Sequence, residues 1–404
     1  MDYERLTEAY SAMEQTRSRL EIATLLAGLF RDTPPEELAA VAHLCLGKLG
    51  PAYDSREVGL SDKSVLRTLA LASGAPLDNL QANYAKAGDI GLVAEEALAA
   101  KSQQPLFGSP LTVSRVWERL HALSLETGSG SQERKFRALA ELLHDGTPQD
   151  ARYLCRTAVG KLRLGFSQML LVDGLAEAFG SREERNMVEA AYNRHPDIGW
   201  LAQRTAADFS SLADVRTTPG IPLRPMLGER LASAEAVLEK HDGESAFEWK
   251  YDGLRVQAHL LKGGTRLFSR SLEDLTPQFP DVVDALEQVL PTGVIVEGEA
   301  LAIDKAGNLL PFQVIAKRRG RKHGLAEKLE EIPVGVWLFD LLYANGQETL
   351  DTPFTERRER LETLFTPSDR VACTTLLRTT NAAEAEQSLL DALEGGCEGL
   401  MSKA

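Results

Sequence analysis

The stretch that decides the fold is EWKYDGLR, from Glu248 to Arg255. An extended approach to Lys250, followed directly by Asp-Gly, predicts a strand that ends in a turn and places the lysine amine at the mouth of a sheet. On the strand that returns, Arg255 would offer a planar fork of donors to a phosphate or a sugar. A lysine attacks phosphorus only as the neutral amine, which nearby charge or desolvation can favour. An ordinary hairpin with a solvated lysine explains the same stretch equally well.

Later segments match the motifs of one family in their order. EWKYDGLR resembles the lysine motif of the covalent nucleotidyltransferases, and in particular that of ATP-dependent DNA ligases of the archaeal and eukaryotic type. The family's companion motifs are resembled by LFSRSLEDLTPQFPD (267–281), VIVEGEALAID (294–304), VWLFDLLYANG (336–346) and EGLMSK (398–403). By these ordered matches the chain is identified as a member of the ligase family.

The resemblance implies a role for individual residues. Lys250 would be the nucleophile that carries AMP, and Phe339 the ring on which adenine stacks. Glu248 would contact adenine through its backbone or its carboxylate. The nucleotide-binding residues that the resemblance implies are Glu248, Arg255, Arg270, Glu299 and Phe339, and the metal-associated acids are Glu299 and Glu398.

The local patterns leave structural alternatives open. Phe339 lies in a nearly continuous apolar run, which is typical of a strand buried on both faces. Glu299 interrupts an apolar strand, where an acid is costly unless it is paired or holds a cation. An edge strand with a solvated Glu297 is the alternative, and a surface ion pair is the alternative for Arg270. We expect His259 to face solvent.

Composition bounds the class of protein. The chain has 404 residues, enough for two or three domains, and 43% hydrophobic with 26% charged residues is typical of a soluble protein with real cores. No run approaches the roughly 20 apolar residues of a membrane span, and MDYERLTEAY is too acidic and polar for a secretory signal. We therefore expect a cytoplasmic protein. The scattered cysteines indicate neither a zinc site nor disulfides, namely Cys45, Cys155, Cys373 and Cys397.

The net charge of −14 argues against a nucleic-acid partner, but two segments are locally basic. Residues 151–168, ARYLCRTAVGKLRLGFSQ, contain no acid, and three of their arginines would align on one helical face if the helix passes Gly160. AKRRGRKHG (316–324) is the second cluster. A solvated surface is the alternative. GKLRLG and PFQVIAKRRGRK resemble stretches of DNA ligases, which implies DNA-backbone contacts by Arg152, Arg156, Lys161, Arg163, Lys317, Arg318 and Arg319.

The chain reads as two unlike parts. Residues 1–214 show helical periodicity almost throughout and resemble the all-helical DNA-binding domain of these ligases. In TGSGSQERK (127–135), glycines and serines open a helix whose free N–H groups suit an anion. A flexible linker is the alternative. The resemblance implies phosphate contacts at Gly128, Ser129, Gly130 and Ser131.

Proline and glycine concentrate in TTPGIPLRPMLGER (217–230), so we place the boundary there and assign residues 215–404 to an adenylation domain. Strands near 246–250, 255–261, 294–304 and 334–342 alternate with helices near 230–240, 279–290, 354–364 and 382–394. The expected fold is therefore multidomain. An all-α domain precedes an α+β nucleotidyltransferase domain, ATP-grasp-like, with antiparallel sheets around a nucleotide cleft.

The resemblance implies a DNA ligase that seals nicks through a lysine–AMP intermediate, in replication, repair and recombination. ATP and Mg²⁺ would be its cofactors. Its partners would be nicked duplex DNA and a sliding clamp. The protein would be a monomer and would not bind a membrane. The chain ends at Ala404, before the family's lysine-rich fifth motif and its OB-fold. Adenylylation is therefore expected to be slow or absent. The alternatives are a DNA-binding ligase fragment without turnover and an RNA-capping guanylyltransferase.

Overall fold

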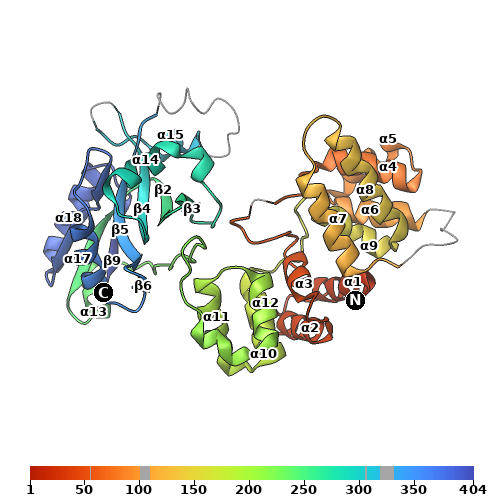
Figure 1. The fold of residues 1–404 in the computed structure, drawn as a ribbon, viewed down its shortest axis with the longest axis horizontal. Helices are drawn as coiled ribbons and strands as arrows, with labels where there is room; N and C mark the ends of the chain where they lie inside the picture. Colours follow the sequence, from red (N-terminus) through yellow and green to blue (C-terminus); the bar gives the residue numbers. More distant parts are fainter. Residues whose placement is uncertain (55, 101–109, 305–306, 319–331) are drawn as a thin grey trace. The chain divides into compact units, whose positions relative to one another are not determined.

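The structure is a computed structural model that describes residues 1–404 except 55, 101–109, 305–306 and 319–331 (Figure 1). The chain divides into two compact units, Met1–Val215 and Arg216–Ala404. The described part of the first unit is helical, and the sheets lie in the second. Within the described residues no helix is both long and apolar enough to cross a bilayer.

The described part of the first unit consists of α-helices of two to four turns and two short 3₁₀ helices, and side chains cap the first turn of many of the α-helices. Ser18, Ser61 and Thr112 each accept a hydrogen bond from a backbone N–H of the first turn that follows. Thr147 does the same for α9 and forms a reciprocal capping box with Asp150. The elements are α1 (Tyr3–Glu14), α2 (Arg19–Asp32), α3 (Leu38–Leu44), α4 (Asp62–Ser73), α5 (Leu77–Ala87), α6 (Ile90–Ala99), α7 (Val113–Leu125), α8 (Ser131–Asp145), α9 (Pro148–Ala158), α10 (Gln168–Phe179), η1 (Arg182–Glu184), α11 (Arg185–Arg194), α12 (Ile198–Ala207) and η2 (Phe209–Asp214).

The second unit contains two sheets. A three-stranded sheet has the order β8-β1-β9, and the larger sheet has the order β3-β2-β4-β5-β6, with β7 beside β5. The elements are α13 (Ala234–Lys240), β1 (Ser245–Lys250), β2 (Leu254–Leu261), β3 (Gly264–Ser269), η3 (Thr276–Gln278), α14 (Pro280–Val289), β4 (Val294–Ala302), α15 (Phe312–Ala316), β5 (Val334–Ala344), β6 (Gln347–Glu348), α17 (Phe354–Leu364), β7 (Val371–Cys373), β8 (Leu376–Thr379), α18 (Ala382–Glu394) and β9 (Gly399–Lys403).

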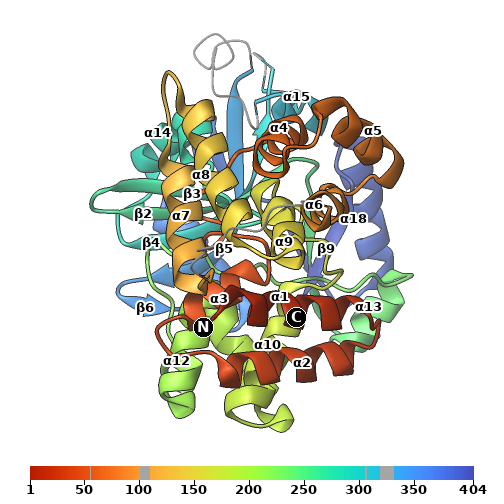
Figure 2. The same cartoon turned by 90° about the vertical axis from the view of Figure 1, so that its right-hand side faces the viewer.

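Helices cover both sheets. α14 packs on β3, β5 and β7, and α17 packs on β5, so the core of the larger sheet includes Phe279, Leu286 and Leu361. α13 and α18 lie together beside β9 in both views (Figure 1, Figure 2). Apolar side chains of the two helices pack against Phe247 of β1.

The α+β character and the main elements predicted for the second unit are confirmed. β1, β2, β4 and β5 occupy the predicted strand positions, and α14, α17 and α18 the predicted helices. The expectation of antiparallel sheets needs a correction, because β7 runs parallel to β5. The prediction also missed β3, β6, β7, β8 and β9. Of these, β7 and β8 are only three and four residues long, too short for a pattern of alternation to stand out.

Two glycines of the helical unit test how closely its helices pack. A Cβ added to Gly91 in α6 would lie 2.7 Å from the carbonyl oxygen of Arg152 and 2.7 Å from Nε of Arg156 in α9, whereas one added to Gly28 in α2 would meet nothing within 4 Å. Gly91→Ala is expected to lower the free energy of unfolding by about 1–3 kcal/mol through overpacking. Gly28→Ala is expected to raise it by about 0.4–1 kcal/mol by stiffening the unfolded chain. Urea unfolding of both variants measures the contrast, and equal effects would contradict it.

Candidate active site

The lysine motif connects the two sheets of the second unit. β1 belongs to the three-stranded sheet and β2 to the larger one, so the expectation that Arg255 returns beside β1 is wrong. Gly253 lies between the two strands, where the chain passes close to β4. A Cβ there would lie 2.6 Å from the carbonyl oxygen of Ala300 and 2.9 Å from Cγ of Glu299. Gly253 is not in the left-handed region, so the backbone conformation does not require glycine. The motif needs glycine here because of the close approach to β4.

Lys250 meets Glu398 because β9 pairs with β1. Lys250 and Gly399 are partners in the antiparallel ladder, and the backbone N–H of Glu398 donates to the carbonyl oxygen of Lys250 at 2.8 Å. The Lys250 ammonium forms an ion pair with the Glu398 carboxylate. Both side chains remain about half exposed, at 42% and 45%, so a ligand can reach them.

Glu248 lies two residues before Lys250 on β1, and its carboxylate is buried. It forms ion pairs with Arg358 of α17 and Lys403 of β9, and the Thr374 hydroxyl donates to its Oε1 at 2.8 Å. Lys403 lies within EGLMSK, but the sequence reasoning gave no role to Arg358 or Thr374. A signal for Arg358 did exist, since it occupies the apolar stripe of its helix together with Phe354 and Leu361.

Arg255 and Phe339 come together on the larger sheet. The guanidinium carbon of Arg255 lies 5.4 Å from the centroid of the Phe339 ring, and Nη2 of Arg255 donates to Glu297 at 2.6 Å. Glu297 is buried, so the alternative of a solvated carboxylate on an edge strand is wrong. Phe339 is the extra residue at a register shift between β4 and β5, where a bulge re-aims a side chain.

Glu299 faces Arg255 across the β2–β4 ladder and is a neighbour of Trp337 in β5. Burial raises its pKa to about 7, although Arg255 and Lys250 both oppose this shift. This shift reflects a carboxylate that has lost water without gaining a matching hydrogen bond. The group is therefore poised to gain from a bound cation or a sugar hydroxyl.

Arg270, the remaining residue that the sequence predicted to bind the nucleotide, does not contact the other predicted residues. Arg270 is exposed directly after β3 and forms no ion pair with another described residue. Glu248, Lys250, Arg255, Glu299, Phe339 and Glu398 thus form the assembled part of the site. Within the described residues no group of three or more acids, histidines and cysteines has the arrangement of a metal centre.

His259 belongs to a buried polar chain that ends at Arg255, so the expectation that it faces solvent is wrong. Its Nδ1 accepts from the Gly220 N–H at 2.9 Å, so its Nε2–H donates to Oε1 of Gln257 at 2.9 Å. The Gln257 amide donates to Glu297 at 3.1 Å, and Glu297 in turn holds Arg255. Only one choice of donor and acceptor is possible for each hydrogen bond of this chain. The chain therefore fixes the orientation of Arg255.

Two of the arginines expected on DNA form ion pairs with acids of the helical unit. Arg156 is buried and forms ion pairs with Glu14 and Asp89, and Arg152 pairs with Glu14 and Glu95. Burial opposes the charged form of Asp89, but the hydrogen bonds from Arg156 lower its pKa nonetheless. The expectation that Arg156 contacts DNA is wrong, because its guanidinium is buried and paired with carboxylates inside the helical unit. Arg152 is also committed to acids, although its side chain is 20% exposed.

The expected alignment with Arg163 is also wrong, because α9 ends at Ala158 and Gly160 has a φ of +70°. After this helix, Leu162 and Leu164 are buried while Lys161 and Arg163 are exposed. Arg163 reaches Asp89 at 3.5 Å, and Lys161 lies 3.8 Å from Asp62. These two residues therefore present positive charge at the surface.

The other basic segment is only partly described. Lys317 is exposed, but Arg318 is fully buried over the Phe279 ring and donates to Asp281 at 2.5 Å. The expectation that Arg318 contacts DNA is therefore wrong. Arg319 lies outside the described residues.

The glycine-serine segment opens α8 as expected. Ser131 is its first residue and Gly130, with a φ of +75°, precedes it without a side-chain cap. Gly128, Ser129 and Gly130 are exposed, and Ser131 is half-buried. Their backbone is thus accessible to an anion.

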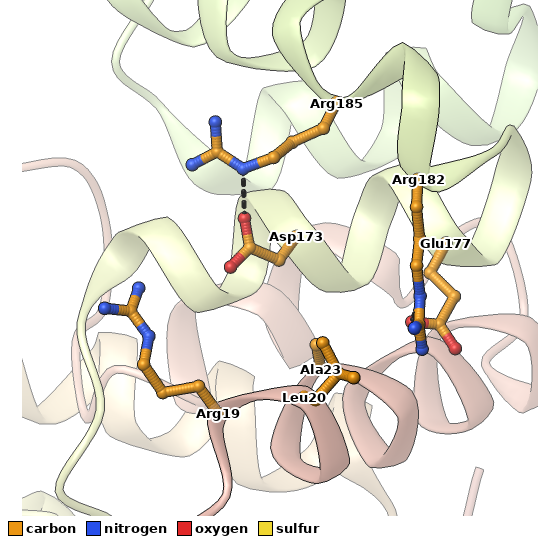
Figure 3. A pocket seen from close by; sticks show the side chains of 7 residues that line it. All are labelled: Arg19, Leu20, Ala23, Asp173, Glu177, Arg182 and Arg185. Atoms are coloured by element: carbon orange, nitrogen blue, oxygen red, sulfur yellow. Dashed lines mark hydrogen bonds and ion pairs between the residues drawn. The ribbon is translucent and has the colours of Figure 1, made fainter.

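A surface pocket of about 320 Å³ lies elsewhere, between α2, α10 and α11 of the helical unit (Figure 3). Its acids already bind arginines, since Arg185 points to Asp173 and Arg182 pairs with Glu177. It is lined by Arg19, Leu20, Ala23, Asp173, Glu177, Arg182 and Arg185. None of these residues was expected in the site.

The neutral His259 predicts a pH dependence of stability. Burial lowers its pKa from 6.5 to about 3. The unfolded chain therefore binds the proton first, and this histidine costs up to about 1.4 kcal/mol per pH unit as pH falls from about 6.5 toward 3. The raised pKa of Glu299 acts in the opposite direction: its contribution to stability is fully present below its ordinary pKa of 4.5 and is lost as pH rises from there through about 7. His259→Gln should keep polar partners but flatten the acid-side slope in urea titrations. Equal slopes in the two proteins would contradict this account.

The chain is similar to known proteins along its whole length. The family described as DNA ligase N terminus matches residues 2–176, and the ATP dependent DNA ligase domain matches residues 225–404. DNA ligase 2 of Thermofilum pendens is 40% identical over 418 residues, covering 100% of this chain and 69% of that protein. The DNA ligase of Thermoplasma volcanium is 37% identical over 407 residues, with the same shares. A solved structure titled Pmar-Lig_PreS3 shares the fold, with a TM-score of 0.54, 16% identity, and coverage of 99% of this chain and 74% of that one. Because relatives of this identity match along the whole chain, it belongs to the family of ATP-dependent DNA ligases.

Proposed function

We propose that this chain provides the DNA-binding and adenylation parts of a ligase that seals nicks in duplex DNA, in replication, repair and recombination. The observation that carries the proposal is the convergence of Lys250, Glu248, Arg255 and Phe339 from β1, β2 and β5 with Glu398, which directly precedes β9. A lysine, an acid beside it, an aromatic ring and a fixed guanidinium suit a nucleotide that becomes joined to the lysine.

The reaction would have three steps. The Lys250 amine attacks the α-phosphate of ATP, a P–N bond forms, and the bond to pyrophosphate breaks. The AMP then moves from Lys250 to the 5′-phosphate at a nick. Finally the 3′-hydroxyl attacks that phosphate, and AMP leaves as the strand is sealed.

The surrounding residues suit the charge that these steps create. Negative charge grows on phosphoryl oxygens, so Arg255, held by Glu297, would hold phosphate or ribose. Glu398 contacts Lys250 and can take up its proton as the bond to phosphorus forms. Phe339 would stack on adenine, and Arg270 would reach the phosphates from the end of β3.

Mg²⁺ fits the donor set of this site. Glu299 and Glu398 provide the carboxylate oxygens that Mg²⁺ prefers, and phosphate oxygens and water commonly complete its shell. Bound there, it would supply neutralisation of phosphate charge.

We propose residues 1–214 as the DNA-binding domain and residues 215–404 as the adenylation domain. Lys161 and Arg163 of the helical unit are exposed cations, and Gly128, Ser129 and Gly130 are exposed directly before α8, where an anion would suit the start of the helix. Lys317 would add a contact from the second unit. The working form is proposed as a monomer on nicked DNA, with a sliding clamp as partner.

The covalent step is tested by intact mass after long incubation with ATP and Mg²⁺. The mass is expected to rise by one AMP, Lys250→Ala to abolish the rise, and Lys262→Ala, an exposed lysine in the turn after β2, to retain it. Labelling by GTP alone would contradict the ligase assignment and favour a capping-type guanylyltransferase. Nick binding without any adduct would favour a DNA-binding role without turnover.

The DNA surface is tested by the salt dependence of binding to a nicked duplex. Removing one phosphate contact by Lys161→Gln should weaken binding and lower the slope of log K against log salt by about 1. The matched change Lys262→Gln should leave the slope unaltered. If both variants behave alike, Lys161 does not contact phosphate.

A further inference from the structure

Two of the residues that hold Glu248, Arg358 and Thr374, lie outside all five motifs. Glu248 lies on the same face of β1 as Lys250, because side chains two apart in a strand point the same way. A nucleotide joined to Lys250 can therefore extend along this face toward Glu248. The orientation of the Glu248 carboxylate decides what it can recognise there.

Two partners saturate one of its oxygens. Nη1 of Arg358 and the hydroxyl of Thr374 both donate to Oε1 of Glu248. A carboxylate oxygen has about two acceptor positions, so Oε1 has none left for a ligand. Oε2 contacts only the Lys403 ammonium among its described partners and keeps one acceptor position.

The two groups on Oε1 are immobile, whereas the group on Oε2 can move. The Arg358 side chain is 3% exposed, and its Nη2 and Nε also donate, to the Thr374 carbonyl at 2.6 Å and to Glu362 at 2.7 Å. Lys403 is 20% exposed on a flexible stem. A ligand can therefore displace the lysine from Oε2 but cannot displace Arg358 from Oε1.

The free position of Oε2 lies near the aromatic ring of the site. The Lys403 ammonium that touches Oε2 also lies 4.9 Å from the centroid of the Phe339 ring and 3.3 Å from the Phe339 carbonyl oxygen. A base stacked on Phe339 would therefore present an edge within reach of Oε2.

We propose that Arg358, with Thr374, is a positioning residue for base selection: it locks Glu248 so that Oε2 accepts a hydrogen bond from the amino group at position 6 of a purine. This assignment rests on the proposed function, since it needs the nucleotide at Lys250 and Phe339. A 6-amino group donates to a carboxylate, whereas a 6-oxo group brings two acceptors together. Arg358 thereby makes the site select adenine without touching the nucleotide.

The test compares equilibrium binding of ATP and inosine triphosphate, which differ at position 6, by calorimetry without divalent metal, so that no adduct forms. The parent chain is expected to bind ATP at least about tenfold more tightly, since a hydrogen bond to a charged group is lost with the oxo base. Arg358→Met should bring the ratio near unity, and Arg358→Lys should restore part of it. Thr374→Val removes one donor to Oε1, keeps the shape, and should lower the ratio less.

The neighbouring arginine provides the matched control. Arg357 lies on the same helix but binds Asp340 at 2.8 and 3.0 Å, so Arg357→Met should lower the melting temperature without changing the ratio. If Arg358→Met does not fold, Thr374→Val decides. Equal loss of both nucleotides, an unchanged ratio in these variants, or a parent without preference would overturn the inference. A parent that binds neither nucleotide would overturn the proposed function itself.

Discussion

The antiparallel pairing of β1 with β9 is the interaction on which the candidate site depends. It brings the segment at Glu398 beside the lysine motif, about 150 residues earlier in the chain. Ladder hydrogen bonds set the register, and a slip of one residue would turn every side chain of β9 to the opposite face. Both ion pairs of the motif, Lys250 with Glu398 and Glu248 with Lys403, cross this single ladder. The geometry of the nucleophile and of the adenine-facing acid is therefore set together.

The second constraint is that a buried charge needs a partner of opposite charge. In both units, buried arginines are paired with carboxylates. Arg156, Arg318 and Arg358 are each buried against one or more carboxylates. Removing one member of such a pair leaves the other charge uncompensated in a poorly polarisable interior, which costs far more than the pair contributes. These arginines therefore hold together the segments that carry their carboxylate partners. Arg255 is held in a similar way by the Glu297 carboxylate, which the neutral side chains of Gln257 and His259 support in turn.

Local sequence predicted the helical first part and the principal strands of the second well, for a physical reason. Periodicity of apolar residues reports which face of an element is buried, and VWLFDLLY and VIVEGEALAI, predicted as strands, do lie in buried strands. Short strands such as β8 escaped, because four residues carry too little pattern. Basic clusters misled for a different reason. A run of arginines looks the same whether its partners are phosphates or distant carboxylates such as Glu14 and Asp281.

The sequence by itself determined the residue types that the chemistry needs and their order along the chain: a lysine before Asp-Gly, acids within apolar strands, and an aromatic ring in a buried strand. Only the tertiary structure decided which of these groups meet. Lys250 finds Glu398, Glu248 is fastened by Arg358, and Arg270 stays apart, because contacts between distant segments depend on strand register and helix packing. The same packing decided which cations stay outside, since burial removed Arg156 and Arg318 from the surface and left Lys161 and Lys317 on it. Charge is written in the sequence, but its availability to a ligand is a property of the fold.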